Sequence, residues 1–204
     1  MKTRLTLLLL ASVAIFFAGC SKYPPTSDRL TEDLAIITQY DTKANFNNYT
    51  TFAVSQTVKK ITSTDTTTIT GSMVTALLSE ISVNMKKRGY ADPTGEDKPD
   101  LGITVTYYQN TNVYAYYPDN YWGYPYYGWG WYYPYYPTYY GSYTTGLASI
   151  QLVDLKYPAP NNQLYIRWNA FIRGLLTNSH TTQDVTNAVD QAFIQTPQLV
   201  KTAK

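Results

Sequence analysis

Leu101-Gly102-Ile103-Thr104-Val105-Thr106-Tyr107-Tyr108 alternates apolar residues with small or polar ones, a pattern typical of a β-strand with one face on a core. A second alternating segment runs from Leu147 to Leu155, and residues 112–145 between the two strands are rich in aromatic residues. Within 114–143 there are fourteen Tyr, three Trp, four Gly and four Pro, and Asp119 is the only charge. Because each Pro removes a backbone donor and fixes φ, no regular periodicity survives there. The sequence therefore predicts a long aromatic insertion between two strands of a small domain.

Two amphipathic helices are predicted outside the insertion. In the first, Met73 to Arg88, apolar residues recur at every fourth position, and Gly89 follows three cations, which suits a left-handed helix end. In the second, Thr182 to Gln195, an apolar face follows a cap at Thr181 or Thr182, and Pro197 ends the helix.

Three further strands are expected at Leu34 to Tyr40, Tyr49 to Val54 and Leu164 to Arg173, whereas the Thr-rich segment from Thr57 to Thr70 is expected to be a surface loop. Each helix has one apolar face to bury against these strands. The fold is therefore predicted to be α+β, a two-layer sandwich with a roughly five-stranded, mainly antiparallel sheet, two helices on one face, and the aromatic loop between two strands.

The N-terminus carries the pattern of an export signal. A basic start is followed by thirteen largely apolar residues, Leu5 to Phe17, which are fewer than the ~20 needed to span a bilayer. Ala18-Gly19-Cys20 then resembles the lipobox of bacterial lipoproteins, although Phe17 stands where Leu is usual. Residues 1–19 are therefore predicted to be a signal peptide; the alternative is a soluble secreted protein with a chance Cys.

Cys20 is the only cysteine, so an intrachain disulfide is impossible and lipidation explains its presence. By resemblance to Gram-negative lipoproteins, Ser21 in place of Asp favours the outer membrane. We expect residues 20–33 to form a lipidated (palmitate-bearing) N-terminus and tether, and residues 34–200 to form one domain. The sequence is compatible with a domain that faces the periplasm and with one that faces the cell surface.

The charge balance bears on possible partners. Removal of Lys2 and Arg4 with the signal peptide lowers Lys+Arg from 16 to 14, equal to the 14 Asp+Glu. The longest basic cluster is Lys86-Lys87-Arg88. Because nucleic-acid affinity depends on neutralising phosphates, a nucleic-acid partner is not expected.

Few residues suit catalysis. His180, the only histidine, is expected on the surface near a helix start, four residues before Asp184, and Cys20 is predicted to carry lipid. No nucleophile-elbow or phosphate-loop motif occurs. We therefore predict no catalytic residue, no metal ligand and no cofactor. A solvated acidic turn is preferred over a calcium site for the cluster of carboxylates at Asp92, Glu96, Asp97 and Asp100.

Two smaller signals lie in the folded part. Asp154 and Arg167 fall on neighbouring predicted strands and could pair across them, a stabilising contact at best. Asp65-Thr66-Thr67 resembles a short O-glycosylation signal of Gram-negative envelope proteins, with Thr66 as the acceptor, and the alternative is a plain Thr loop.

The aromatic insertion supplies the candidate ligand site. Tyr and Trp present flat apolar faces with a polar tip, suited to sugar rings, protein partners or lipid headgroups. The candidate residues are Trp122, Trp129, Trp131, Tyr126, Tyr127, Tyr135 and Tyr136. The alternative is a low-complexity spacer without a ligand.

A series of short landmarks runs along the domain. They are Tyr49 to Ala53, Arg88-Gly89-Tyr90, Pro99-Asp100-Leu101, Ile150 to Asp154, Ile166-Arg167-Trp168 and Phe193 to Pro197. Their order resembles that of bacterial lipoproteins of the domain-of-unknown-function 4136 family over Ile36 to Pro197. The resemblance implies no established activity, and members often hold a variable Tyr/Gly/Pro-rich insertion at this place.

Taken with the lipobox, these features predict a non-enzymatic cell-envelope lipoprotein, a binding or structural module held to the membrane by its lipid. The first alternative is a surface lipoprotein that binds envelope polysaccharide, peptidoglycan or an envelope protein through the Tyr/Trp-rich loop. A carboxylate-based enzyme is a remote alternative, because the chain offers so few titratable groups of the kind that active sites use.

Overall fold

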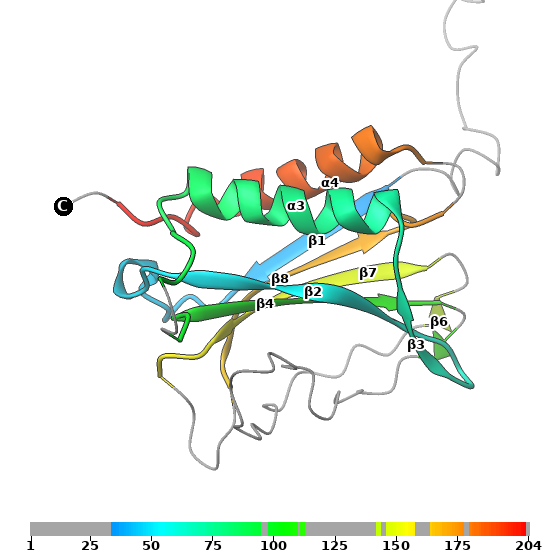
Figure 1. The fold of residues 1–204 in the computed structure, drawn as a ribbon, viewed down its shortest axis with the longest axis horizontal. Helices are drawn as coiled ribbons and strands as arrows, with labels where there is room; N and C mark the ends of the chain where they lie inside the picture. Colours follow the sequence, from blue (N-terminus) through cyan, green and yellow to red (C-terminus); the bar gives the residue numbers. More distant parts are fainter. Residues whose placement is uncertain are drawn as a thin grey trace, which may run out of the picture. The chain divides into compact units, whose positions relative to one another are not determined.

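The computed structural model describes residues 34–94, 98–109, 111–112, 142–143, 146–157, 164–177 and 180–202. Its main sheet has six strands in the order β1-β8-β7-β4-β2-β3, and two helices cover one face (Figure 1). The strands are β1 Ala35–Tyr40, β2 Phe52–Ile61, β3 Thr66–Ile69, β4 Leu101–Tyr108, β7 Leu147–Asp154 and β8 Ile166–Arg173. A separate two-residue ladder joins β5 Thr111–Asn112 to β6 Ser142–Tyr143. The predicted α+β class is confirmed.

The two strands that flank the aromatic segment pair directly. β4 and β7 are antiparallel, with Leu101 opposite Asp154 and Tyr108 opposite Leu147. β8 adds to the other side of β7, and β1 pairs with β8 at the edge, both antiparallel. The aromatic segment itself, predicted as an insertion between these strands, lies mostly outside the described residues.

The sheet differs from the prediction in strand number and in one pairing. β2 runs on to Ile61 and turns back into β3, so the segment expected as a loop supplies a sixth strand. Thr66, Thr67 and Thr68 are exposed, so this edge strand has no apolar alternation by which to recognise it. β2 pairs with β4 in parallel, which makes the sheet mixed. The first helix leads the chain back to the end of the sheet where β2 begins, so β4 starts at that end and runs in the same direction as β2.

The two helices, α3 Ser72–Lys87 and α4 Thr182–Ile194, lie side by side on the sheet (Figure 1). Their bounds agree with the prediction to within one residue. Gly89 follows α3 with a φ of 87°, a left-handed conformation that suits glycine. Thr181 caps α4 in a capping box with Asp184, so the first of the two predicted caps is the one used.

Trp168 is the largest side chain of the core, with 1 % of its surface exposed. Its indole lies 4.9 Å from the ring of Phe193, and its Nε1 donates a hydrogen bond of 2.9 Å to Thr196 Oγ1. One residue of β8 thereby joins the sheet to the end of α4 by both packing and a buried hydrogen bond.

Arg88, just after α3, binds the C-terminal end of α4. Its guanidinium donates to the carbonyl oxygens of Phe193 at 2.6 Å, Leu199 at 2.8 Å and Thr196 at 3.1 Å. Phe193 lies in the last turn of α4, where the helix dipole is negative, so a cation beside its carbonyl is favourable. Burial lowers the pKa of Arg88 from its ordinary value. The contact fixes how the two helices lie on the sheet.

Candidate functional site

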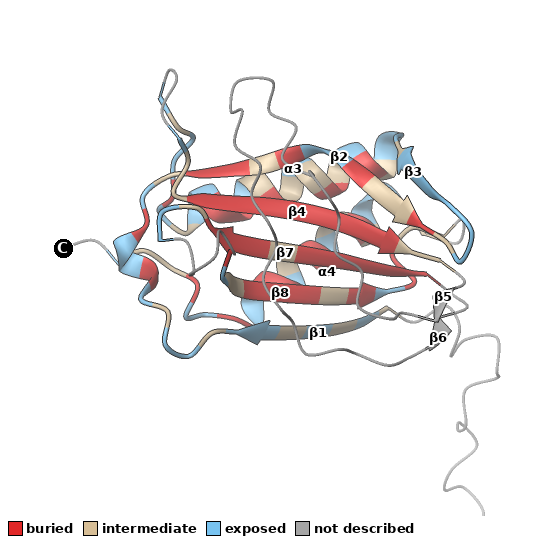
Figure 2. Ribbon diagram, turned by 90° about the horizontal axis from the view of Figure 1, so that it is seen from below, coloured by how far each residue is buried: buried red, intermediate tan, exposed pale blue. Residues whose placement is uncertain are grey.

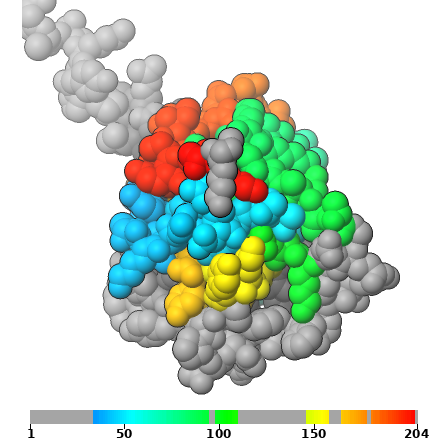
Figure 3. Space-filling view, turned by 90° about the vertical axis from the view of Figure 1, so that its left-hand side faces the viewer, coloured from blue at the N-terminus to red at the C-terminus, as the bar shows by residue number. Residues whose placement is uncertain are grey.

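Four segments meet at one end of the sheet. They are the loop with the short 3-10 helix Phe46–Asn48 before β2, the residues entering β4, the residues after β7 and the start of β8. Figure 3 looks onto this end, where the cyan segment before β2, the green segment entering β4 and the yellow segment after β7 adjoin. A network of charged and hydroxyl side chains lies here, and its buried centre is Asp154.

Asp154 is completely buried and accepts five hydrogen bonds. Its Oδ2 accepts from Tyr49 Oη at 2.6 Å and from Arg167 Nη2 at 2.8 Å and Nε at 3.0 Å. Its Oδ1 accepts from the backbone N–H groups of Lys156 at 3.0 Å and Tyr157 at 2.8 Å. The expected pair of Asp154 with Arg167 is confirmed, and the carboxylate is saturated by the chain's own donors.

Arg167 joins two carboxylates that are far apart in sequence. Its Nη1 donates to Asp41 Oδ2 at 2.6 Å, and its guanidinium stacks over the ring of Tyr165 with the central carbon 4.6 Å from the ring centre. Burial opposes the charge of Arg167, but the hydrogen bonds with Asp154 and Asp41 outweigh it and raise its pKa above the ordinary value. Arg167 therefore remains a fixed cation.

Burial, with the hydrogen bond to Asp154, raises the pKa of Tyr49 above its ordinary value. The Tyr49 hydroxyl thus stays protonated at neutral pH and acts as a donor. A general acid or base needs a pKa near the working pH. Tyr49 and Arg167 keep their protons at neutral pH, and the arrangement is suited to joining segments of the fold.

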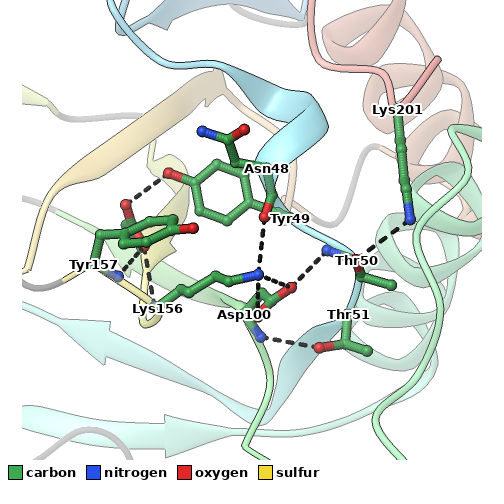
Figure 4. Close-up of polar contacts among 9 residues, drawn as sticks. Asn48, Tyr49, Thr50, Thr51, Asp100, Lys156, Tyr157 and Lys201 are labelled. Carbon is green, nitrogen blue, oxygen red and sulfur yellow. Dashed lines mark hydrogen bonds and ion pairs between the residues drawn. The ribbon is translucent and has the colours of Figure 1, made fainter. Parts of the chain in front are cut away.

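The outer part of the network is formed around Lys156 and Asp100 (Figure 4). The Lys156 side chain is 36 % exposed, and its ammonium group donates to the backbone oxygen of Asn48 at 3.0 Å and lies 3.3 Å from the Asp100 carboxylate. The same carboxylate accepts from the backbone N–H of Thr50 at 2.6 Å. Lys201, from the C-terminal segment, donates to the Thr50 hydroxyl at 3.3 Å. The loop before β2 is thus tied to β4 and to the residues after β7.

A second polar cluster lies between the helices. Asn84 donates through Nδ2 to Asp190 Oδ1 at 2.7 Å and to Glu80 Oε1 at 3.1 Å, so one amide joins two carboxylates. Burial, followed by the hydrogen bond with Asp190, raises the pKa of Glu80. Lys87 lies 3.7 Å from Glu80 and partly balances its charge. Sequence reasoning missed this cluster, because nothing in either helix alone indicates which residues of the other helix face it.

The predicted site residues fall in different places. Cys20 and the aromatic residues Trp122, Trp129, Trp131, Tyr126, Tyr127, Tyr135 and Tyr136 lie outside the described residues, as do Glu96 and Asp97 of the acidic turn. The other two carboxylates of that turn form ion pairs, Asp92 with Lys86 at 2.7 Å and Asp100 with Lys156. Thr66 is exposed at the start of β3.

His180 lies just before α4, as expected, and is half-buried. Its Nε2 is buried and has no hydrogen-bond partner among the described residues. It lies beside Gly174, where an added Cβ would come within 3.9 Å of it. Within the described ranges, no three His, Cys, Asp or Glu side chains gather as a metal ion would need. Neither described helix has the length and hydropathy to cross a bilayer.

The model of one family, Domain of unknown function (DUF4136), matches residues 36–198. The chain belongs to this family. A crystal structure of a DUF4136 family protein from Bacteroides thetaiotaomicron is 31% identical in sequence, with a TM-score of 0.64, and the match covers 83% of this chain and 98% of that one. The expected family resemblance is confirmed.

Two other solved structures are more distant. A dodecamer of a PelC point variant from Paraburkholderia phytofirmans is 10% identical, with a TM-score of 0.40 over 83% of this chain and 100% of that one. A PDZ domain protein from Parabacteroides distasonis is 16% identical, with a TM-score of 0.43 over 85% of this chain and 41% of that one. None of the curated proteins matches the chain.

The DUF4136 landmarks in this chain coincide with its main tertiary contacts. Asp154 and Arg167 form the buried pair, and Trp168 packs on the end of α4. Arg88 holds that same helix end, and Asp100 holds the loop before β2. In this DUF4136 domain these landmark residues thus hold distant segments of the fold together.

Proposed function

We propose that the mature chain is a non-enzymatic lipoprotein of the cell envelope, anchored through lipid on Cys20 and acting as a binding or structural module. Ala18-Gly19-Cys20 behind the apolar run from Leu5 to Phe17 supports the anchor. Ser21 in place of Asp supports the outer membrane of a Gram-negative bacterium. The partners on this proposal are the membrane and an envelope polymer or protein.

The observation that carries the non-enzymatic part is the saturated carboxylate of Asp154. Its five hydrogen bonds come from the chain itself, and the raised pKa of Tyr49 keeps that hydroxyl a donor. Active sites instead tend to hold groups whose pKa is matched to proton transfer. This buried network therefore favours a structural or binding role over carboxylate catalysis.

Replacing Cys20 with Ser tests the anchor. We expect the protein to move from the membrane fraction to the soluble fraction, because no acyl chain is attached to hold it. Fractionation followed by mass measurement of the N-terminal peptide checks this, and Ser27→Ala in the tether serves as the control that keeps the lipid. Membrane association that persists in the Cys20→Ser variant, with no lipid mass on the unsubstituted chain, would contradict the proposal.

The aromatic segment favours one alternative, a surface lipoprotein that binds envelope polysaccharide, peptidoglycan or an envelope protein. Fourteen Tyr and three Trp within 114–143 are more aromatic surface than a spacer requires, since Gly and Ser serve that role with less risk of sticking. Ring stacking would dominate the binding, because Asp119 is the only charge.

Sedimentation with isolated envelope polymer tests this alternative. We expect the protein to sediment with the polymer at low and high salt alike, and the combined Trp122→Ala, Trp129→Ala and Trp131→Ala variant to sediment several-fold less. Ile194→Ala, at a position 65% exposed on α4, is the matched control and should sediment as the unsubstituted chain does. Equal sedimentation of all three proteins would exclude the rings as the binding surface.

A further inference from the structure

β3 is an exposed strand at the edge of the main sheet. Thr66, Thr67 and Thr68 are all exposed, and Ile69 is half-buried. β3 pairs with β2 on one side, and no other described strand pairs with its second side. Figure 2 shows the turn between β2 and β3, with most of β3, exposed at one corner of the sheet. A second macromolecule can therefore reach both the threonine side chains and the outer backbone edge of this strand.

Hydrogen bonds within the β2–β3 turn fix the residues that lead into Thr66. The backbone N–H of Thr62 donates to the carbonyl oxygen of Asp65 at 2.8 Å. Thr62 Oγ1 donates to the same carbonyl at 3.1 Å and accepts from the Asp65 N–H at 3.0 Å. The Asp65 carboxylate in turn accepts from the N–H of Thr66 at 2.7 Å. Asp65 and Thr66 are thus held in one defined arrangement at the start of an exposed strand.

The hydroxyl groups of the hairpin threonines differ in their partners. Thr62 Oγ1 is bonded within the turn, and Thr68 Oγ1 accepts from Lys59 Nζ at 2.7 Å. The hydroxyls of Thr66 and Thr67 form no hydrogen bond with the described residues. Because these two oxygens are exposed and unpaired, an enzyme can engage them without breaking a contact of the fold.

Of these two threonines, Thr66 has the sequence context of a modified residue. It directly follows Asp65, and Asp65-Thr66-Thr67 resembles a short O-glycosylation signal of Gram-negative envelope proteins in which the residue after Asp is the acceptor. The fold places this tripeptide where such a reaction needs it, with an exposed hydroxyl, extended backbone and an unpaired strand edge among the described residues.

A sugar at this position also has a physical use. Proteins commonly protect the edge strands of their sheets with Lys, Pro or a bulge, because an open edge can pair with another chain. β3, with the sequence Thr-Thr-Thr-Ile, contains no charge and no proline, and both residue types favour strands. A bulky, solubilising glycan at the start of β3 keeps a foreign strand from this edge.

We propose that Thr66 Oγ1 is a site of O-linked glycosylation. The donor is an activated sugar whose C1 carries a diphosphate leaving group. The bond from Thr66 Oγ1 to C1 forms as the bond from C1 to the phosphate oxygen breaks. The diphosphate leaves with the bonding electron pair, and the hydroxyl proton passes to a base of the transferase. The inference rests on the proposed export of the chain to the cell envelope, where this transferase would act.

Mass measurement of one peptide tests the proposal. The full chain is produced in the bacterium that encodes it and purified from its envelope. Cleavage after Lys60 and Lys86 releases residues 61–86 as a single peptide, since no Lys or Arg lies between them. We expect this peptide to be heavier than its sequence by one or more sugar residues. Fragmentation should place the added mass on Thr66, and mild alkali should remove it.

Three variants locate the acceptor. Thr66→Val keeps a β-branched side chain of similar shape, so we expect the fold to be retained and the added mass to be lost. Thr66→Ser restores a hydroxyl and should carry the sugar again. Thr67→Val is the matched control, because Thr67 is the neighbouring exposed threonine with an unpaired hydroxyl, and it should keep the sugar. Equal urea midpoints of the three variants, each freed of glycan, verify that the fold is unchanged.

The N-terminal peptide of the same preparation separates this proposal from that of the lipid anchor. An unmodified 61–86 peptide, from a chain that carries lipid on Cys20, would overturn the glycosylation and leave the anchor standing. Sugar on Thr66 without lipid on Cys20 would support the glycosylation and overturn the anchor, and the lack of both would overturn both. Added mass on Thr67, or mass that persists in Thr66→Val, would also overturn the assignment to Thr66.

Discussion

Replacing Arg167 with Met lowers the free energy of unfolding by about 3–5 kcal/mol, because it leaves a buried charge without its partner. Asp154 is fully buried, and among the described residues Arg167 supplies its only cationic donor, through two hydrogen bonds of 2.8 and 3.0 Å. The Tyr49 hydroxyl and two backbone N–H groups remain, but none of them carries charge. Urea unfolding, with the midpoint and slope fitted together, measures the loss.

Two further variants separate the buried pair from a general effect of removing arginine. Arg173→Met, at an exposed position on the same strand, should change stability by less than about 1 kcal/mol. Combining Asp154→Asn with Arg167→Met should cost less than the sum of the two single losses, because no buried charge remains. An Arg167→Met protein within about 1 kcal/mol of the unsubstituted chain would show that Asp154 does not depend on this partner.

Replacing Trp168 with Ala lowers the free energy of unfolding by about 3–5 kcal/mol, the range for removing a large buried aromatic side chain. The indole fills the space between β8 and the end of α4, 4.9 Å from the Phe193 ring. Its loss leaves a cavity there and also leaves the completely buried Thr196 hydroxyl without the donor at 2.9 Å. Both effects act in the same direction, and thermal or urea unfolding reports their sum.

Trp168→Phe divides the two contributions. It keeps most of the packing but removes the indole N–H, so we expect a smaller loss of about 1–2 kcal/mol. Ile194→Ala, one residue from Phe193 but 65% exposed, should lie within about 0.5 kcal/mol of the unsubstituted chain. If Trp168→Ala and Ile194→Ala gave equal losses, Trp168 would not join β8 to α4 in the way described.

Prediction of the fold from sequence succeeded where the signal is local. Leu77, Ile81 and Met85 recur at the helical period, and all three are buried under α3. Gly89 and Thr181 mark the ends of their helices because capping depends on the nearest few residues. Asp154 and Arg167 were recognised as a pair because they lie on consecutive strands. The family match over residues 36–198 agrees with the order of these local signals.

The parallel pairing of β2 with β4 had a signal that the prediction passed over. A strand, a helix and a second strand in this order place the two strands parallel when the helix packs on the sheet, and α3 makes this crossover. The sixth strand had no such signal, because β3 lies exposed at an edge and its threonines show no buried side.

The sequence by itself determined the helices with their caps, the strands with a buried side and the order of the family landmarks, since each depends on neighbours a few residues apart. Only the tertiary structure decided that Asp41 and Tyr49 complete the network of Asp154. Asp41 contacts Arg167, 126 residues away in the sequence, and Tyr49 contacts Asp154, 105 residues away. It alone also showed that the central strands β4 and β7 are buried on both faces. Both outcomes depend on which distant segments meet across the sheet, and periodicity along the chain carries no information on that.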